Sequence, residues 1–244
     1  MNITYLNHSG FLLEWETCYW LFDYYKGVIP ELNPEKELFI FSSHSHGDHF
    51  NPEVFDLENK CKRVTYIFSV EIRNTCEEMK NASNNVKKIP EIIYVESRMN
   101  YELKNLSDKN LVLHTLQSTD LGCAFLIEYE GKVIYHAGDL HWWYWIGEPD
   151  DWNEQMTLDY KNEMEYLKGK EIDLAFTPVD PRLGETYAWG INYLLENTHI
   201  KHVIPMHFWD DFSICKKYAE EYSIPQETEY HLLSEDGQKL RIML

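Results

Sequence analysis

The hydrophobic residues of the first part of the chain occur in short runs that predict β-strands. Such runs cover residues 3–6, 11–15, 19–22 and 38–41. The last run, Leu38 to Phe41, is apolar throughout, which is typical of a strand buried on both faces. Asn51-Pro52-Glu53 then predicts a helix start, because Asn caps helices, Pro suits the first turn and an acidic side chain interacts favourably with the N-terminus.

The second part mixes strand and helix patterns. Strands are predicted over residues 111–117, 124–129 and 132–135, with Glu130-Gly131 as a two-residue hairpin turn. Beyond Trp152 apolar residues recur at helical spacing, and they are Met156, Tyr160, Met164 and Leu167. This spacing predicts a helix with an acidic outer face.

Two strand-then-helix units and a closing strand complete the predicted order. The units are 172–176 with 189–196 and 202–205 with 212–222, and the closing strand is 241–244. Because strands precede helices in both halves, we expect an α/β fold of two packed sheets with helices outside. No repeat or linker-like segment divides the chain, which predicts one domain over residues 1–244.

The composition excludes several classes of protein. Hydrophobic residues make up 44% and aromatic residues 15% of the chain, too many for a disordered protein. No apolar run approaches the roughly 20 residues that a membrane-spanning helix needs. There are 22 Lys and Arg against 41 Asp and Glu, and the net charge of −19 disfavours nucleic acid and anionic membranes as partners.

The five cysteines are scattered and form no Cys-x-x-Cys pair, which indicates buried thiols in a reducing compartment. The first residues lack the pattern of a secretory signal. We therefore expect a cytoplasmic protein, whose oligomeric state the sequence does not predict. Any metal site must be built from histidine and carboxylate side chains.

The segment from His44 to His49 (His-Ser-His-Gly-Asp-His) carries the strongest chemical signal. In an extended chain His44 and His46 point the same way, while Gly47 permits a sharp turn that presents Asp48 and His49 from another direction. One segment can thus supply two ligands to each of two neighbouring ions, for which Zn²⁺, Fe²⁺ and Mn²⁺ are suited. The alternative is a surface histidine cluster that binds no ion.

Two more candidate ligands follow predicted strands. Asp139 comes after the strand 132–135, and His207 comes after the strand 202–205. Since the ends of several strands converge on one crevice in sheet-based folds, we expect both side chains to join the same site. The alternatives are that Asp139 caps a turn and that His207 is a hydrogen-bonded core histidine.

These motifs resemble those of the metallo-β-lactamase superfamily over nearly the whole chain. The segment 7–11 looks like the opening hairpin of its ascorbate-6-phosphate-lactonase-like branch of metal-dependent hydrolases, and the segments 44–49, 136–139 and 204–208 match the family's metal-binding motifs. The resemblance implies a four-layer αββα sandwich with one or two divalent ions at its edge. Zn²⁺ is the expected metal, with Mn²⁺ and Fe²⁺ as alternatives.

The resemblance also assigns ligands. It implies that His44 and His46 hold one ion, that Asp48, His49 and His207 hold the other, and that Asp139 lies between them. The family usually places a further histidine after the strand matched here by residues 111–117, but this chain has Gln117-Ser118-Thr119-Asp120 there. We expect Asp120 to replace that histidine, directly or through a water, unless it only caps a turn. The site of His44 and His46 would then be the weaker one.

Three residues are candidates for binding substrate. Trp142 belongs to the aromatic run after Asp139 and would form a pocket wall, His8 would lie at the pocket rim, and Arg182 would hold an anionic group. The alternatives are loop packing for Trp142, a structural hydrogen bond for His8 and a surface ion pair for Arg182.

The resemblance predicts a metal-dependent hydrolase of a small molecule such as a lactone or phosphoester. Asp48 would orient the metal-activated water and take part in proton transfer. Alternatives are a nuclease or phosphodiesterase of the same superfamily, which the charge of −19 disfavours, and a di-iron redox enzyme. A fourth is a metal-binding protein without catalysis, because the usual histidine is absent.

Overall fold

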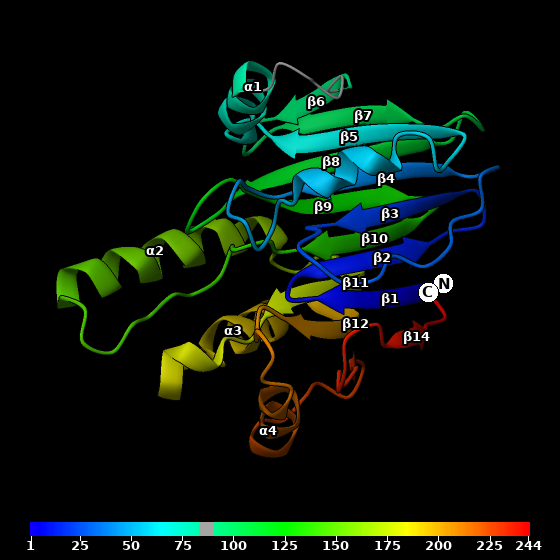
Figure 1. The fold of residues 1–244 in the computed structure, drawn as a ribbon. Helices are drawn as coiled ribbons and strands as arrows, with labels where there is room; N and C mark the ends of the chain where they lie inside the picture. The colour runs from blue at the N-terminus through cyan, green and yellow to red at the C-terminus, as the bar shows by residue number, and fades with distance from the viewer. Residues whose placement is uncertain (83–89) are drawn as a thin grey trace.

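The computed structural model describes residues 1–82 and 90–244, which form two seven-stranded sheets (Figure 1). In sheet order, the first consists of β14 (Lys239–Arg241), β1 (Asn2–Asn7), β2 (Gly10–Glu14), β3 (Cys18–Phe22), β4 (Glu37–Ser42), β5 (Arg63–Ser69) and β6 (Ile92–Val95). The second consists of β13 (Glu229–Tyr230), β12 (His199–Met206), β11 (Glu171–Pro178), β10 (Lys132–His136), β9 (Cys123–Tyr129), β8 (Asn110–Gln117) and β7 (Asn100–Lys104).

Each sheet has an antiparallel part and a parallel part. Strands β3 to β6 run parallel in the first sheet, and β10 to β13 run parallel in the second. The loops that follow β4, β10 and β12 carry the candidate ligands of the sequence motifs, and the loop after β11 carries Arg182. The parallel strands therefore deliver several candidate ligands to one end of the molecule.

Helices cover the outer faces of both sheets. The short 3₁₀ helix η1 (Pro52–Leu57) and α1 (Ile72–Ala82) bury apolar side chains on the first sheet. The helices α2 (Asp150–Leu167), α3 (Trp189–Asn197) and α4 (Ser213–Glu221) bury theirs with the second, and a second 3₁₀ helix, η2 (Pro181–Thr186), follows β11. The predicted four-layer αββα arrangement is confirmed.

Strand β4 is apolar from Leu38 to Phe41 because both of its faces are buried. Its alternate residues Phe39 and Phe41 belong to the core between the sheets, whereas Leu38 and Ile40 pack under the helices outside. A strand with both faces buried needs apolar residues on both.

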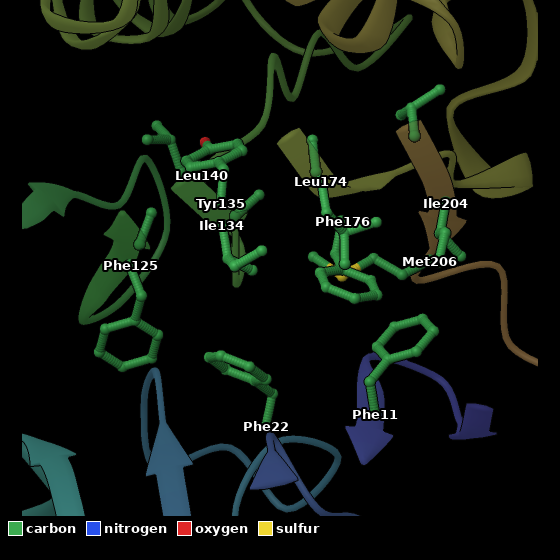
Figure 2. Close-up of a cluster of buried hydrophobic side chains, with 14 of the residues drawn as sticks. Phe11, Phe22, Phe125, Ile134, Tyr135, Leu140, Leu174, Phe176, Ile204 and Met206 are labelled. Carbon is green, nitrogen blue, oxygen red and sulfur yellow. The ribbon is translucent and has the colours of Figure 1, made fainter. Parts of the chain in front are cut away.

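Aromatic side chains fill the space between the sheets (Figure 2). Phe11 and Phe22 of the first sheet face Phe125 and Phe176 of the second, and the Phe11 and Phe176 ring centroids are 4.3 Å apart. Burying each such side chain stabilises the fold by about 1.5–3 kcal/mol. Phe22 also stacks on His136 at 4.8 Å, so the core reaches the floor of the candidate site.

Some local predictions are confirmed and others are corrected. Asn51 caps η1 by accepting from the Glu53 amide at 2.9 Å, and Glu130 and Gly131 form the predicted turn with φ of 52° and 72°. The closing strand lies at 239–241 rather than 241–244. Strands β5 to β7 and helix α1 were not predicted. Among the described residues, no helix combines the length and apolar character needed to cross a membrane.

Candidate metal centre

Side chains from seven segments converge at the carboxyl ends of the parallel strands. The contributing loops follow β1, β3, β4, β8, β10, β11 and β12, and they bring His8, Asp23, His44–His49, Asp120, Asp139, Asp180 and His207 together. All six predicted ligands lie in this cluster, together with the predicted replacement ligand Asp120. These segments lie far apart in the sequence, and the order of the strands in the two sheets brings them together.

Asp139 lies between two groups of ligand-type side chains. Its Oδ1 is 3.2 Å from Nε2 of both His49 and His207, and its Oδ2 is 3.4 Å from His44 Nε2. The first group contains His44, His46, Asp120 and Asp139, and the second group contains His8, Asp48, His49 and His207. Within each group the ligand atoms lie within 4.8 Å of one another. This is the arrangement of two adjacent cation sites that share one carboxylate.

Asp120 occupies the position expected of the replacement ligand. Its Oδ2 is 3.6 Å from His46 Nδ1. The loop reaches this position because Gly122, with φ of 71°, packs directly on the strand that leads to His44: a Cβ at this glycine would lie 2.0 Å from the Ser43 carbonyl oxygen. The first group therefore has two imidazoles and two carboxylates.

The side chains present fit a divalent metal. His44 Nε2, His49 Nε2 and Asp139 Oδ1 are buried and have no hydrogen-bond partner among the described residues. Leaving three buried polar atoms unsatisfied costs free energy unless a cation uses them. Nitrogen and oxygen donors without sulfur suit Zn²⁺, Mn²⁺ and Fe²⁺.

Two buried carboxylates orient the histidines from behind. Asp23 Oδ2 accepts from His49 Nδ1 at 2.8 Å, and Asp180 Oδ2 accepts from His207 Nδ1 at 3.0 Å. A carboxylate can only accept, so each histidine carries a proton on Nδ1, and Nε2 is the ring nitrogen that faces Asp139 and would bind a metal. Such partners fix the ring and increase its basicity.

Electrostatics at these positions favour ionised carboxylates. Burial alone would raise the pKa of Asp180, but hydrogen bonds from His207 and Arg182 outweigh it and lower the pKa to about 2. Burial also opposes the charge on Asp23, yet its hydrogen bond with His49 holds its pKa below the usual value. Both carboxylates are therefore ionised at neutral pH and can hold the histidines in front of them.

His8 lies beneath the site rather than at its rim. It is buried in the β1–β2 turn with φ of 56°, its carbonyl oxygen accepts from the His207 amide at 3.2 Å, and its Nε2 lies 3.3 Å from Asp48 Oδ2. Burial lowers the pKa of His8 to about 4, so the ring is neutral at neutral pH. His8 is placed either to donate to Asp48 or to bind a metal beside His49.

An open pocket of about 310 Å³ lies above the candidate ligands. Its lining includes His46, Asp48, Thr119, Asp120, Asp139, Trp143, Trp145, Trp152, Met156, Arg182 and His207. One wall is therefore aromatic and apolar. Arg182 supplies a positive charge, and its guanidinium donates to both Asp180 oxygens and lies over the rings of Trp145 and Trp209 at 5.8 and 5.1 Å.

The pocket wall is formed by neighbours of Trp142 and not by Trp142 itself. Trp142 packs on Trp189 at 5.2 Å, and its Nε1 donates to Thr157 at 2.9 Å. The side chains of Trp143 and Trp145 face the pocket instead. The path of the loop decides which tryptophan of the run faces the site. The residue types alone do not reveal that path.

Sequence reasoning assigned no positioning role to Asp23, Ser43 or Asp180 and did not place Trp152 in the pocket. A signal existed for the two acids, because Asp23 directly follows the apolar strand β3 and Asp180 lies just after β11. Acidic residues at the ends of buried strands are candidates for site chemistry in the same way as Asp139.

The sequence matches a known family and several of its members. The family model described as a β-lactamase superfamily domain matches residues 2–144. The chain is 26% identical over 246 residues to a UPF0173 metal-dependent hydrolase of Desulforamulus reducens, covering 93% of this chain and 95% of the relative. A relative of the same name in Heliobacterium modesticaldum is 25% identical over 218 residues, covering 85% of this chain and 82% of the relative.

Solved structures share the fold at low sequence identity. Igni18, a metallo hydrolase from Ignicoccus hospitalis, superposes with a TM-score of 0.60 at 16% identity, covering 100% of this chain and 98% of that one. Human tRNase Z, short form, has a TM-score of 0.56 at 17% identity and 100% coverage of both chains. CmlA, a diiron β-hydroxylase from Streptomyces venezuelae, has a TM-score of 0.54 at 12% identity over 84% of this chain and 44% of its own. Proteins with this fold thus carry different activities.

Proposed function

Since the chain belongs to the metallo-β-lactamase superfamily, we propose that it is a metal-dependent hydrolase of a small lactone, ester or phosphoester. The observation that carries this proposal is the position of Asp139, which lies between two groups of ligand-type side chains at the floor of an open pocket. Bound there, divalent metal ions would activate a water as the nucleophile and polarise the bond to be cleaved.

The protein's own residues have separate roles in this proposal. Asp48 lies in the pocket lining with a partly exposed carboxylate, so it is placed to orient the attacking water and to accept its proton. His8 Nε2, at 3.3 Å from Asp48 Oδ2, holds that carboxylate in place. Burial opposes ionisation of Asp48, but the nearby His8 and His49 together outweigh it and keep the pKa of Asp48 below its usual value.

The pocket walls support a substrate with an apolar or ring-shaped part and an anionic group. Trp143, Trp145 and Trp152 offer ring faces, against which sugar rings and aromatic groups pack well. Arg182 keeps nearly half of its side chain exposed although Asp180 holds it, so it can still meet a carboxylate or phosphate of the substrate.

Nuclease activity is the less favoured alternative. A nucleic-acid substrate would need a basic surface, and the net charge of −19 repels phosphate backbones. We propose instead that the partner is a small molecule. We also propose a reducing cytoplasm as the compartment, since all five cysteines are free thiols.

One observation favours a second candidate function, oxidation at a di-iron centre. Asp120 gives the first group of ligands a second carboxylate, and oxygen-rich ligand sets suit iron as well as zinc. CmlA shows that a diiron β-hydroxylase has a similar fold. Zinc remains the metal that we propose, because the second group has three imidazoles and one carboxylate.

Metal analysis combined with a substrate panel tests these functions. The purified chain, stripped and reloaded with Zn²⁺, Mn²⁺ or Fe²⁺, should hydrolyse at least one member of a panel of lactones, phosphodiesters and thioesters. Asp48→Asn should lose most of the activity, because the carboxylate's proton-accepting role is removed. Cleavage of single-stranded RNA at a higher rate than any small ester would favour the nuclease. Oxygen consumption by the iron form alone would favour the di-iron enzyme, and full metal occupancy without any turnover would favour a non-catalytic protein.

The role of Arg182 is tested by comparing paired substrates. Arg182→Met should raise KM for an anionic ester and leave KM for its neutral methyl ester within about twofold. An equal rise for both substrates would indicate that Arg182 only supports Asp180.

A further inference from the structure

The edge of the second sheet carries another set of ligand-type side chains, well away from the candidate metal centre. His202 lies in β12 opposite Glu229 of β13, in the parallel register that also pairs Val203 with Tyr230. The His231 amide continues the ladder by donating to the Val203 carbonyl at 2.9 Å. Glu229 and His231 are two residues apart in extended chain, so their side chains lie on the same face as that of His202.

The possible metal-binding atoms of these three side chains lie close together. His202 Nδ1 is 3.1 Å from His231 Nε2 and 3.4 Å from Glu229 Oε2. The side chains of His202 and His231 are only 14% and 12% exposed, whereas that of Glu229 is 66% exposed. Two imidazoles are thus largely withdrawn from water, and a carboxylate closes the cluster on the solvent side.

A backbone carbonyl determines which ring nitrogen of His202 carries the proton. His202 Nε2 lies 3.2 Å from the Met243 carbonyl oxygen, which can only accept a hydrogen bond. The ring proton therefore sits on Nε2, and the Nδ1 lone pair points into the cluster. Metal-binding histidines typically have this arrangement, with the second ring nitrogen held by a carbonyl or carboxylate.

We propose that His202, Glu229 and His231 form a further site for a divalent transition metal of the zinc class. Two imidazole nitrogens and one carboxylate oxygen leave a fourth tetrahedral position for water. The ion would link the two-residue strand β13 to β12, whose other end leads to His207, about 17 Å from His202 along the chain at ~3.3 Å per residue. It is a separate site from the candidate metal centre and shares no residue with it.

Zinc binding by matched variants tests the proposal. The parent is Asp139→Ala, which lacks the shared carboxylate of the main centre. In equilibrium dialysis with Zn²⁺, Asp139→Ala should bind one equivalent more than the double variant Asp139→Ala/His231→Ala. If both variants bind that equivalent, Asp139→Ala should bind it at least roughly tenfold more tightly. The control is Asp139→Ala/His199→Ala, which removes an exposed histidine of the same strand outside the cluster and should match the parent.

A second measurement does not depend on the folding of the Asp139 variants. In the otherwise unchanged chain, Glu229→Gln should reduce the rise in Tm on adding Zn²⁺, because metal bound only to the folded state stabilises it. Its hydrolytic activity should equal that of the unchanged chain. Equal zinc stoichiometry and affinity with and without His231, or an unchanged Tm response in Glu229→Gln, would overturn the proposal and leave a hydrogen-bonded histidine pair.

Discussion

His49 Nδ1 donates to Asp23 Oδ2 at 2.8 Å, and both side chains are completely buried. The same carboxylate accepts from the Ser43 amide at 2.7 Å and from the Ser43 hydroxyl at 2.6 Å. Ser43 Oγ lies in turn 2.9 Å from His44 Nδ1. One buried carboxylate therefore orients a histidine of each ligand group. A substitution at Asp23 should alter the position of both histidines.

Asp23→Asn should weaken metal binding at both groups. Asparagine can still accept one hydrogen bond, but it lacks the charge that favours the Nδ1–H tautomer of His49. Loss of such a partner typically costs 10–100-fold in metal affinity. Competition with a chromogenic chelator would measure both dissociation constants. Asp173→Asn is the matched control, because Asp173 is a buried, hydrogen-bonded aspartate remote from the ligands. Weakening of one site alone would contradict the coupling through Ser43.

Asp139→Ala should remove the metal of the main centre and the hydrolytic activity together. Asp139 is the one described side chain whose oxygens lie within 3.4 Å of His44, His49 and His207, so both groups lose a ligand at once. Metal content of the dialysed protein gives the direct measurement. Retention of full occupancy at the main centre would refute the ligand role of Asp139, whatever happens to activity.

Asp120→His should tighten the first group. The substituted imidazole would enter beside His46, which now has Asp120 Oδ2 3.6 Å from its Nδ1. Nitrogen in place of oxygen favours Zn²⁺ over Mn²⁺. The dissociation constant for Zn²⁺ should therefore fall relative to the dissociation constant for Mn²⁺. Titration of the metal-free protein with each ion measures both constants. Asp120→Ala is the companion variant and should weaken the same site. Unchanged stoichiometry and affinity in both variants would show that Asp120 only caps the loop.

The predictable part of the site is local in sequence. His44, His46, Asp48 and His49 lie in one segment after a recognisable strand, and short-range spacing alone brings them together. Asp139 and His207 also follow strands with clear apolar patterns, so convergence at strand ends was foreseeable. The expectation of two packed sheets with helices outside followed from the order of the predicted strands and helices, and the four layers were implied by the family resemblance.

The unpredicted part depends on long-range packing. Asp23 meets His49 only because β3 and β4 are parallel neighbours, and nothing near Asp23 in the sequence indicates that pairing. Trp142 and Trp143 differ in role because the loop turns between them, one ring packing on α3 and the other facing the pocket. Strand β5 escaped prediction because it is only partly buried over its first three residues and begins with Arg63.

Gly122→Ala should destabilise the protein more than Gly131→Ala. The two glycines have nearly equal φ, 71° and 72°, so both variants incur the left-handed backbone cost of about 1–2 kcal/mol. Gly131 has open space around it, whereas a Cβ on Gly122 would collide with the Ser43 carbonyl. The collision adds roughly 1–3 kcal/mol and displaces the Asp120 loop. Urea unfolding of both variants measures the difference, and equal free energies of unfolding would exclude a close contact at Gly122.

Asp173→Asn should change how stability depends on pH. Asp173 accepts from the Val133 amide at 2.9 Å and from Lys201 Nζ at 2.8 Å. Burial raises the pKa of this carboxyl, but Lys201, the Val133 amide and Lys132 outweigh it and hold the pKa below 3.8.

Because the folded pKa lies below the unfolded one, the unfolded chain takes up the proton first as the pH falls. The carboxylate's contribution to stability is therefore fully present above about pH 4 and is lost as the pH falls through the folded pKa. The free energy of unfolding should be about 1–3 kcal/mol higher for the unchanged chain than for Asp173→Asn at pH 7, and the gap should narrow below pH 4. Urea titrations from pH 7 to pH 3, with chelator in every sample so that metal loss does not contribute, measure that gap. A gap that stays constant down to pH 3 would show that the Asp173 carboxylate is not stabilised by its charge.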